Sequence, residues 1–227
     1  MKIKGLVETS FVDWPGLVAA VVFLARCNFR CPYCHNHELV LAPETLPGRP
    51  PGEVLDQLRP FASWLDGVVI TGGEPTLTPG LDQLCRNFKE EGFKVKLDTN
   101  GSRPEVIREL TRAGLIDAVS MDLKAPLSDE VLHHRLAGVA ADLAAIQASI
   151  DLLLASGLEV EFRTTVVPGL LAEEHLKIMA GQIKGARRWK LNHFRPLTCL
   201  DPDFQSISPL PDTEMARLQE MVDCWLR

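Results

Sequence analysis

The sequence predicts an α/β fold in which helices cover a mostly parallel sheet. Strand-like and helix-like segments alternate about six times along the 227 residues. The strand-like segments are continuous apolar runs, the pattern expected when both faces of a sheet are covered. Hydrophobic residues make up 46% of the chain, so there is enough apolar material for a sizeable core.

Six segments have the apolar composition of buried strands. The first contains the run from Val21 to Phe23, and the second follows an Asp66-Gly67 turn. The predicted strands are residues 17–25, 68–71, 93–98, 116–121, 158–167 and 189–194.

Helix boundary signals separate these strands. Thr78 is expected to cap a helix whose first residue is Pro79. Ser102-x-x-Glu105 is a capping-box pattern. Gly157 is expected to end a third helix. The predicted helices are residues 53–64, 79–91, 139–156, 172–184 and 215–226, together with one that follows Ser102 and ends at Gly114; residues 38–52 are expected to form a loop.

Polar residues collect where the predicted strands end. Active sites of α/β barrels lie at the carboxyl ends of the strands, so this distribution favours an incomplete barrel over an open sheet. We expect one domain over residues 1–227, with 1–16 as an N-terminal lead-in and about 197–227 as a C-terminal extension with one helix. The strand-end segments are 26–38, 71–75, 98–101, 122–124, 168–169 and 193–195, with Arg163 inside the fifth strand.

Charge and hydropathy exclude two kinds of partner. A net charge of −6 is a poor match for nucleic acid, which needs a basic surface. The apolar run 16–25 is too short to span a bilayer, and it lacks the cleavage site of a signal peptide. Clustered thiols without a signal peptide predict a reducing compartment, so we expect a cytoplasmic protein.

Cys27, Cys31 and Cys34 follow the first strand with the spacing C-x3-C-x2-C. Zinc usually has four protein ligands, so His35 or His37 would have to complete such a site, and a redox pair would have only two thiols. Three thiolates suit an iron–sulfur cluster, which commonly has four cysteine ligands, with one iron left open for chemistry. The scattered cysteines are expected to be structural: Cys85, Cys199 and Cys224.

The cysteine spacing, with the aromatic Tyr33 before the last cysteine, resembles the signature of radical S-adenosylmethionine (SAM) enzymes. The segment 72–75, GGEP, resembles the second motif of that superfamily. From Lys4 to about Pro196 the chain looks like the glycyl-radical-enzyme activases, which act on pyruvate formate-lyase or anaerobic ribonucleotide reductase. Segment 8–16, ETSFVDWPG, most resembles the activases of the reductase. The other matching segments are 13–16, 34–36, 98–101, 122–124 and 167–169.

This resemblance implies an incomplete (β/α)6 TIM-like barrel with one [4Fe–4S] cluster on the three clustered cysteines and SAM on the open iron. It implies that the backbone at Gly72 and Gly73 takes the SAM amino group and that Lys124 pairs with its carboxylate. Relatives carry Pro-Tyr-His on the last strand, where this chain has Asn192-His193-Phe194-Arg195, so His193 or Arg195 would contact the adenosine from one strand face. The remaining implied cofactor-binding residues are Tyr33, His35, Glu74 and Arg163.

Two carboxylates at neighbouring strand ends, Asp98 and Asp122, would repel each other unless a cation lay between them. The resemblance places a monovalent cation near Asp98, Thr99 and Asp122. Simpler interpretations stay open: bare turns at 72–73 and 98–101, a surface ion pair at 122–124, and an outward salt bridge of Arg163. His133 and His134 are expected to be solvated.

The resemblance implies a radical SAM enzyme in which an external reductant, flavodoxin or ferredoxin, supplies an electron for cleavage of SAM. The resulting 5′-deoxyadenosyl radical would abstract hydrogen from a glycine of a partner, expected to be anaerobic ribonucleotide reductase. Asp13 is a candidate for positioning that glycine, and no general base is expected. The alternatives are a small-molecule enzyme similar to 7-carboxy-7-deazaguanine synthase, a zinc protein without catalysis, or an activase of another glycyl radical enzyme.

Overall fold

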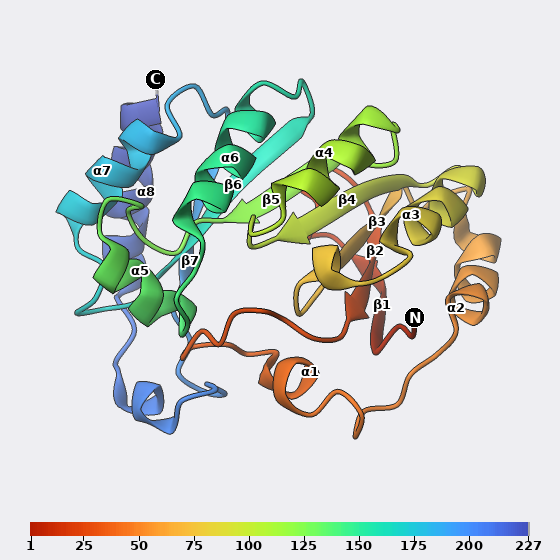
Figure 1. Cartoon of the computed structure of the whole chain (residues 1–227), viewed down its shortest axis with the longest axis horizontal. Helices are drawn as coiled ribbons and strands as arrows, with labels where there is room; N and C mark the ends of the chain where they lie inside the picture. The colour runs from red at the N-terminus through yellow and green to blue at the C-terminus, as the bar shows by residue number, and fades with distance from the viewer. Residues whose placement is uncertain (227) are drawn as a thin grey trace. The chain divides into compact units, whose positions relative to one another are not determined.

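The computed structural model describes residues 1–226 and contains a sheet with the strand order β1-β2-β3-β4-β5-β6-β7. Strand β1 pairs with β2 in antiparallel orientation, whereas β2 with β3, β3 with β4, and β6 with β7 are parallel pairs (Figure 1). The predicted α/β class with a mostly parallel sheet is therefore confirmed. The strands are β1 Gly5–Ser10, β2 Ala19–Leu24, β3 Gly67–Gly72, β4 Lys94–Thr99, β5 Ala118–Asp122, β6 Glu159–Val166 and β7 Trp189–His193.

Helices alternate with the strands after β2, as the sequence pattern predicts. The α-helices are α1 His37–Leu41, α2 Pro51–Leu58, α3 Leu81–Glu90, α4 Pro104–Arg112, α5 Glu130–Ala137, α6 Leu143–Leu154, α7 Glu173–Gln182 and α8 Asp212–Leu226. Short 3-10 turns occupy Arg59–Phe61, Pro75–Leu77 and Pro202–Ser206.

Several boundaries differ from those expected. The lead-in 1–16 contains β1, an antiparallel strand whose short, partly exposed sequence lacks a continuous apolar run. Thr78 does not cap α3, because the preceding residues form a 3-10 turn and Gly80 takes the cap position. Ser102 does not form a capping box either, because α4 is preceded by Arg103. Helix α6 begins after Asp142, whose carboxylate accepts a hydrogen bond from the Ala145 N–H at 3.0 Å.

The first of two compact units comprises residues 1–28, 36–99 and 103–119. Its strands β2, β3 and β4 lie in parallel register, with Ala19 opposite Gly67 and Gly67 opposite Lys94. Trp14 packs in a buried cluster with Ala19, Val21, Val69 and Ala118. A Cβ at Gly67 would lie 2.8 Å from the Trp14 ring, so glycine at the start of β3 makes room for this indole.

The second unit comprises residues 29–35, 100–102 and 120–226. Helix α8 packs against α7 and β7 (Figure 1), and its Gln219 accepts from Leu191 N–H and donates to Trp189 O, both at 2.8 Å. The predicted C-terminal extension also returns to the cysteine-rich segment, since Asp201 N–H donates to Pro32 O at 2.9 Å. Phe204 places its ring 6.5 Å from that of Tyr33.

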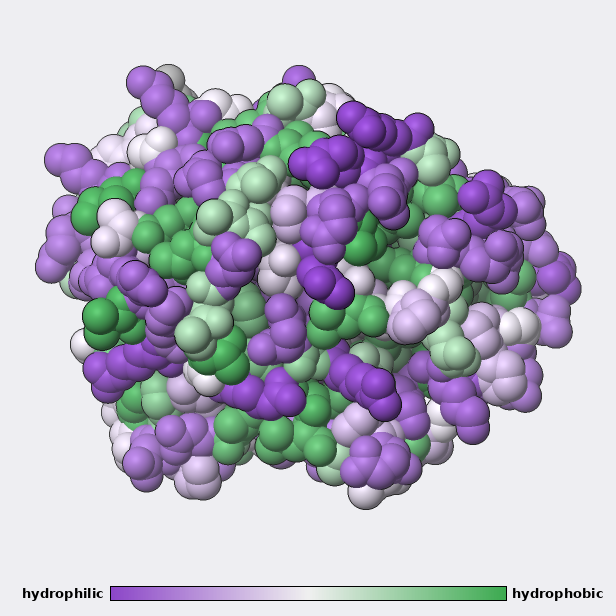
Figure 2. Space-filling view, in the orientation of Figure 1, coloured by the Kyte–Doolittle hydropathy of each residue, from purple (hydrophilic) through white to green (hydrophobic). Residues whose placement is uncertain are grey.

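Hydrophilic and hydrophobic residues are interspersed over the face visible in Figure 2. Among residues 1–226, no helix combines the length and apolar character needed to cross a membrane.

Candidate functional site

The three clustered cysteines lie in the connection between β2 and α1, which we call the cysteine loop (residues 25–36). Within residues 1–226, none of the three cysteines forms a disulfide, and all three are partly exposed. Cys34 N–H donates to Cys31 O at 3.0 Å, so these two cysteines flank a tight turn. Cys27 belongs to the first unit and Cys31 and Cys34 to the second. Arg26, just before Cys27, has a φ of 71°, a left-handed conformation that is uncommon for residues with a side chain.

In the first unit, Gly72 and Gly73 bring the end of β3 against the start of the cysteine loop. A Cβ would lie 2.2 Å from Leu24 O at Gly72 and 1.9 Å from Arg26 O at Gly73. Gly73 N–H donates to Leu24 O at 2.9 Å, and Glu74 N–H donates to Arg26 O at 2.7 Å. The two glycines thus make room for the protein's own backbone, and the expected contact of their backbone with the SAM amino group stays a prediction.

Asn36, two residues after Cys34, closes the same contact from the other end of the loop. Its side-chain amide donates to Gly72 O at 3.1 Å. The Gly72 carbonyl therefore ties the exit of the cysteine loop to the end of β3.

Glu74 is a buried carboxylate that joins the ends of β3 and β4 within the first unit. One of its oxygens accepts from Thr76 N–H at 3.1 Å, from the Thr76 hydroxyl at 2.6 Å and from the Thr99 hydroxyl at 2.7 Å. Glu74 was expected to bind the cofactor and Thr99 a cation, and the structure bonds the two side chains to each other.

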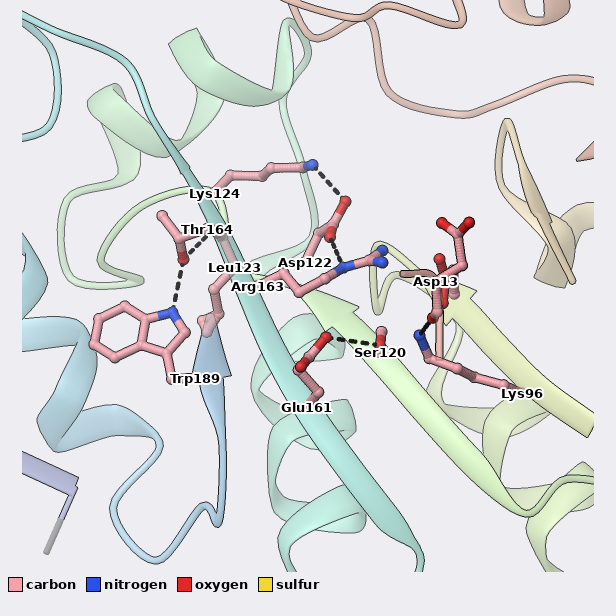
Figure 3. Close-up of polar contacts among 11 residues, drawn as sticks. Asp13, Lys96, Ser120, Asp122, Leu123, Lys124, Glu161, Arg163, Thr164 and Trp189 are labelled. Carbon is pink, nitrogen blue, oxygen red and sulfur yellow. Dashed lines mark hydrogen bonds and ion pairs between the residues drawn. The ribbon is translucent and has the colours of Figure 1, made fainter. Parts of the chain in front are cut away.

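Lys96 is a buried cation on β4 that sequence reasoning missed. Its side chain is 4% exposed, and its ammonium lies 3.4 Å from an Asp98 carboxylate oxygen. The same ammonium donates to Asp13 O at 2.5 Å (Figure 3). The only signal was a lysine within the apolar strand, in KVKLD. Because Lys96 contacts both residues, it fixes the Asp13 backbone to the end of β4 and balances the charge of Asp98.

In the second unit, Asp122 lies between two cations at the end of β5. One oxygen is 3.0 Å from Lys124 Nζ and the other is 3.1 Å from Arg163 Nε (Figure 3). Burial acts to raise the pKa of Asp122, but Lys124 and Arg163 outweigh it and lower this pKa to about 2. Asp122 is therefore ionised at neutral pH, and Arg163 points to it from β6.

Lys124 also lies over the ring of Tyr33, with its ammonium 5.9 Å from the ring centroid, a cation–π arrangement. Burial acts to lower the pKa of Lys124, but Asp122, Tyr33 and Cys31 raise it well above its usual value. Burial raises the pKa of the Cys31 thiol, and the charge of Lys124 partly opposes this. Lys124 is thus a permanent positive charge beside the cysteine loop.

The segment after β7 differs from the prediction. Because β7 ends at His193, Arg195 lies beyond the strand, and the expectation that both residues share one strand face is wrong. His193 is exposed, 3.7 Å from Asp212. The backbone carbonyl of Arg195 instead lies 2.7 Å from Nε2 of His35, which ties the cysteine loop to this segment.

His133 was expected to be solvated, and this was wrong. The side chain, on α5, is 1% exposed, and its Nδ1 has no hydrogen-bond partner among residues 1–226. Burial, followed by the charges of Lys124 and His134, lowers its pKa to about 4. Its neighbour His134 contacts Ala141 O at 3.2 Å. The sequence does not indicate this burial, because both histidines lie near the polar start of the helix, after Asp129 and Glu130.

Among residues 1–226, no three His, Cys, Asp or Glu side chains are arranged to hold a single metal ion. The monovalent cation near Asp98, Thr99 and Asp122 stays a prediction. Both carboxylates have a protein cation beside them, Lys96 or the pair Lys124 and Arg163.

Comparison with known proteins identifies the family of this chain. Residues 21–180 match the radical SAM superfamily. The chain belongs to the radical SAM superfamily, and it is an enzyme of that type. Over 219 residues it is 35% identical to the "Putative glycyl-radical enzyme activating enzyme MJ1227" of Methanocaldococcus jannaschii, covering 95% of this chain and 89% of the relative.

A further relative agrees with this membership, and one solved structure shares the fold. A pyruvate formate-lyase-activating enzyme of Streptococcus mutans is 30% identical over 210 residues, covering 84% of this chain and 77% of the relative. The crystal structure of Streptococcus suis SuiB bound to SAM superposes with a TM-score of 0.69 at 17% identity. It matches 91% of this chain, which spans about half of SuiB (48%), and it shows the shared fold.

The superfamily implies a [4Fe–4S] cluster and SAM, and the donor chemistry of this chain fits both. Three thiols within eight residues, none of them in a disulfide, would supply three cluster ligands and leave one iron open. Lys124 supplies a fixed cation for a carboxylate. The unpaired Nδ1 of His133 adds a buried polar atom that residues 1–226 leave without a partner.

Replacing Gly73 with alanine should displace the start of the cysteine loop, because the new Cβ would lie 1.9 Å from Arg26 O. We expect Gly73→Ala to bind less than half of the wild-type iron after anaerobic reconstitution and to melt at a lower temperature. Gly181→Ala is the control, since nothing lies within 4 Å of a Cβ at that α7 position. Wild-type iron content in Gly73→Ala would contradict this account.

Replacing Asp122 with asparagine should destabilise the protein at neutral pH, because Lys124 and Arg163 lose their counter-ion. The Asp122 pKa is lowered from 3.8 to about 2, so its contribution is complete above its unfolded-state pKa and is lost as the pH falls through its folded-state pKa. With the side chain 33% exposed, we expect a loss on the order of 1 kcal/mol.

The measurement is the melting temperature of wild type and Asp122→Asn as a function of pH. Their difference should shrink as the pH falls from about 4 to about 2. Asp151→Asn, which changes an exposed carboxyl on α6, should show no such convergence. A gap that stays constant down to about pH 2 would mean that Asp122 is not held ionised by its neighbours.

Proposed function

We propose that this chain is a glycyl-radical-enzyme activase whose partner is an anaerobic ribonucleotide reductase. The observation that carries the activase assignment is the 35% identity to the archaeal activating enzyme, which extends over nearly the full length of both chains. The partner is inferred from the resemblance of segment 8–16, ETSFVDWPG, to reductase activases. Clustered cysteines without a disulfide support a reducing compartment, which we take to be the cytoplasm.

Cys27, Cys31 and Cys34 would hold one [4Fe–4S] cluster, and SAM would bind the open iron. The bound cofactors supply one-electron cleavage of SAM to methionine and a 5′-deoxyadenosyl radical, which takes a hydrogen atom from the partner's glycine Cα. The electron comes from outside the chain, from a flavodoxin or a ferredoxin. No acid or base is required of this chain, so its residues serve to bind, to orient and to exclude side reactions.

Lys124 has the position and charge to bind the carboxylate of SAM. An ammonium has three donors, and Asp122 accepts one of them at 3.0 Å. The contact with Tyr33 keeps the side chain beside the cysteine loop. Asp122 and Arg163 would act by holding Lys124 in place, and the backbone at Gly72 and Gly73 would accept the SAM amino group. His35, Glu74, His193 and Arg195 remain proposed contacts of the cofactor.

Asp13 would position the partner's glycine from an ordered turn after β1. Ser10 donates to the Asp13 carboxylate, and the N–H groups of Val12 and Asp13 each donate to the Ser10 hydroxyl at 3.2 Å. This turn leaves Phe11 72% and Val12 73% exposed. Two adjacent large apolar side chains held out to solvent support a protein partner rather than a small-molecule substrate.

The test is anaerobic incubation of reconstituted, reduced protein with SAM and purified anaerobic ribonucleotide reductase, followed by EPR. We expect a glycyl radical on the reductase with wild type and with Cys224→Ala, which changes an exposed cysteine. Cys31→Ala should give no radical, because the cluster loses a ligand. A radical only on another glycyl radical enzyme would overturn the partner. SAM cleavage that depends on a small molecule alone would overturn the activase assignment.

Replacing Phe11 and Val12 with serine should weaken partner binding. Their exposed side chains touch little of their own protein, so stability and partner-independent SAM cleavage should be unchanged. We expect the reductase concentration for half-maximal activation to rise at least about tenfold, since burying two such side chains contributes more than 1.4 kcal/mol. Leu154→Ser, which changes an exposed leucine on α6, is the control. An unchanged half-maximal concentration would place the contact elsewhere.

A further inference from the structure

His133 is the one buried histidine of α5 that the proposed chemistry leaves unused. Its side chain is 1% exposed and its Nδ1 lacks a hydrogen-bond partner within residues 1–226. Buried polar atoms in native proteins are nearly always hydrogen-bonded, and an exception points to a bound group or to a water. We therefore consider which group could accept a hydrogen bond from this nitrogen when the cluster is bound.

The C-terminal end of α5 meets Arg30, in the part of the cysteine loop (residues 29–35) that belongs to the same unit. Ala137 O, at the end of α5, accepts from Arg30 N–H at 2.8 Å. A Cβ at Gly138 would lie 1.9 Å from Arg30 O, so backbone meets backbone there. His133 and Ala137 are four residues apart in one helix and therefore share a face. The imidazole therefore lies about one helical turn before the point where α5 meets the cysteine loop.

The charges around His133 agree with this placement. After burial, the positive charge of Lys124 is the next cause of its lowered pKa, and Lys124 also acts on Cys31 and Tyr33 of the cysteine loop. His133 is therefore a neutral imidazole at neutral pH, with one N–H to donate. The other charged group that acts on it is His134, on its own helix.

We propose that His133 Nδ1–H donates a hydrogen bond to a sulfur of the [4Fe–4S] cluster held by the cysteine loop, and that it tunes the reduction potential of that cluster. This rests on the cluster assignment of the proposed function and is independent of the partner. Hydrogen bonds to cluster sulfurs raise the reduction potential, because they stabilise the more negative reduced state. His133 would thus contact the cluster directly and change its reduction potential.

The test compares His133→Leu, His133→Asn and His134→Leu in the full chain, reconstituted anaerobically without SAM or partner. The midpoint potential is measured by EPR-monitored titration, and the melting temperature of each apoprotein is measured separately. Asparagine can place an amide N–H near the position of Nδ1, whereas leucine has no donor. His134→Leu controls for loss of a histidine from the same helix.

We expect His133→Leu to shift the midpoint potential to a more negative value, His133→Asn to recover at least half of the shift, and His134→Leu to leave it unchanged. The apoprotein of His133→Leu should melt no lower than wild type, because the nitrogen has no partner to lose. Unchanged potentials in both His133 variants would overturn the proposal and indicate a buried water. A lowered apoprotein melting temperature with an unshifted potential would indicate a purely structural histidine.

If His133→Leu fails to fold, an unshifted potential in His133→Asn would still overturn the proposal. A wild-type protein that holds the cluster but activates no glycyl radical enzyme would overturn the proposed function alone. Failure of the two proposals is therefore distinguishable.

Discussion

The close backbone contact between the end of β3 and the start of the cysteine loop is the constraint on which the candidate site depends. Only residues without a Cβ allow it, because side chains at 72 and 73 would overlap Leu24 and Arg26. The contact fixes where the loop leaves β2, and Asn36 fixes where it returns. Glu74, the next residue, then links the same strand end to β4 through Thr99. One pair of glycines thus sets the path of the cysteine loop.

Buried charges are paired within each unit, so the geometry of each pair is set by the protein itself. Lys96 joins Asp98 to the backbone of Asp13 in the first unit. Asp122 joins Lys124 to Arg163 in the second. An unpaired buried charge is costly, so each pair holds its members in one geometry. The proposed SAM carboxylate would meet a lysine that is already charged and oriented, and less ordering would be needed on binding.

The proposed activity requires no acid–base catalysis by the protein, but it requires that the cofactors and the partner's glycine be held in position. The cofactors carry the radical step, and the chain contributes cysteine ligands, a fixed cation and an ordered turn with exposed Phe11 and Val12. In our proposal, His133 also controls a property of the cofactor, because it would change the reduction potential of the cluster. An activase acts on another protein. The surface that binds this partner and the reduction potential of the cluster can therefore be changed independently.

The sequence by itself determined the alternating α/β pattern, the spacing of three thiols and the polar strand ends, because these depend on local order along the chain. It could not determine which residues that are distant in the sequence form hydrogen bonds or ion pairs with each other. The bond between Glu74 and Thr99, the contacts of Lys96 with Asp98 and Asp13, and the burial of His133 depend on tertiary packing. The β1 strand and the helix caps were missed for a related reason: short segments carry weak local signals, and neighbouring strands and turns decide their conformation.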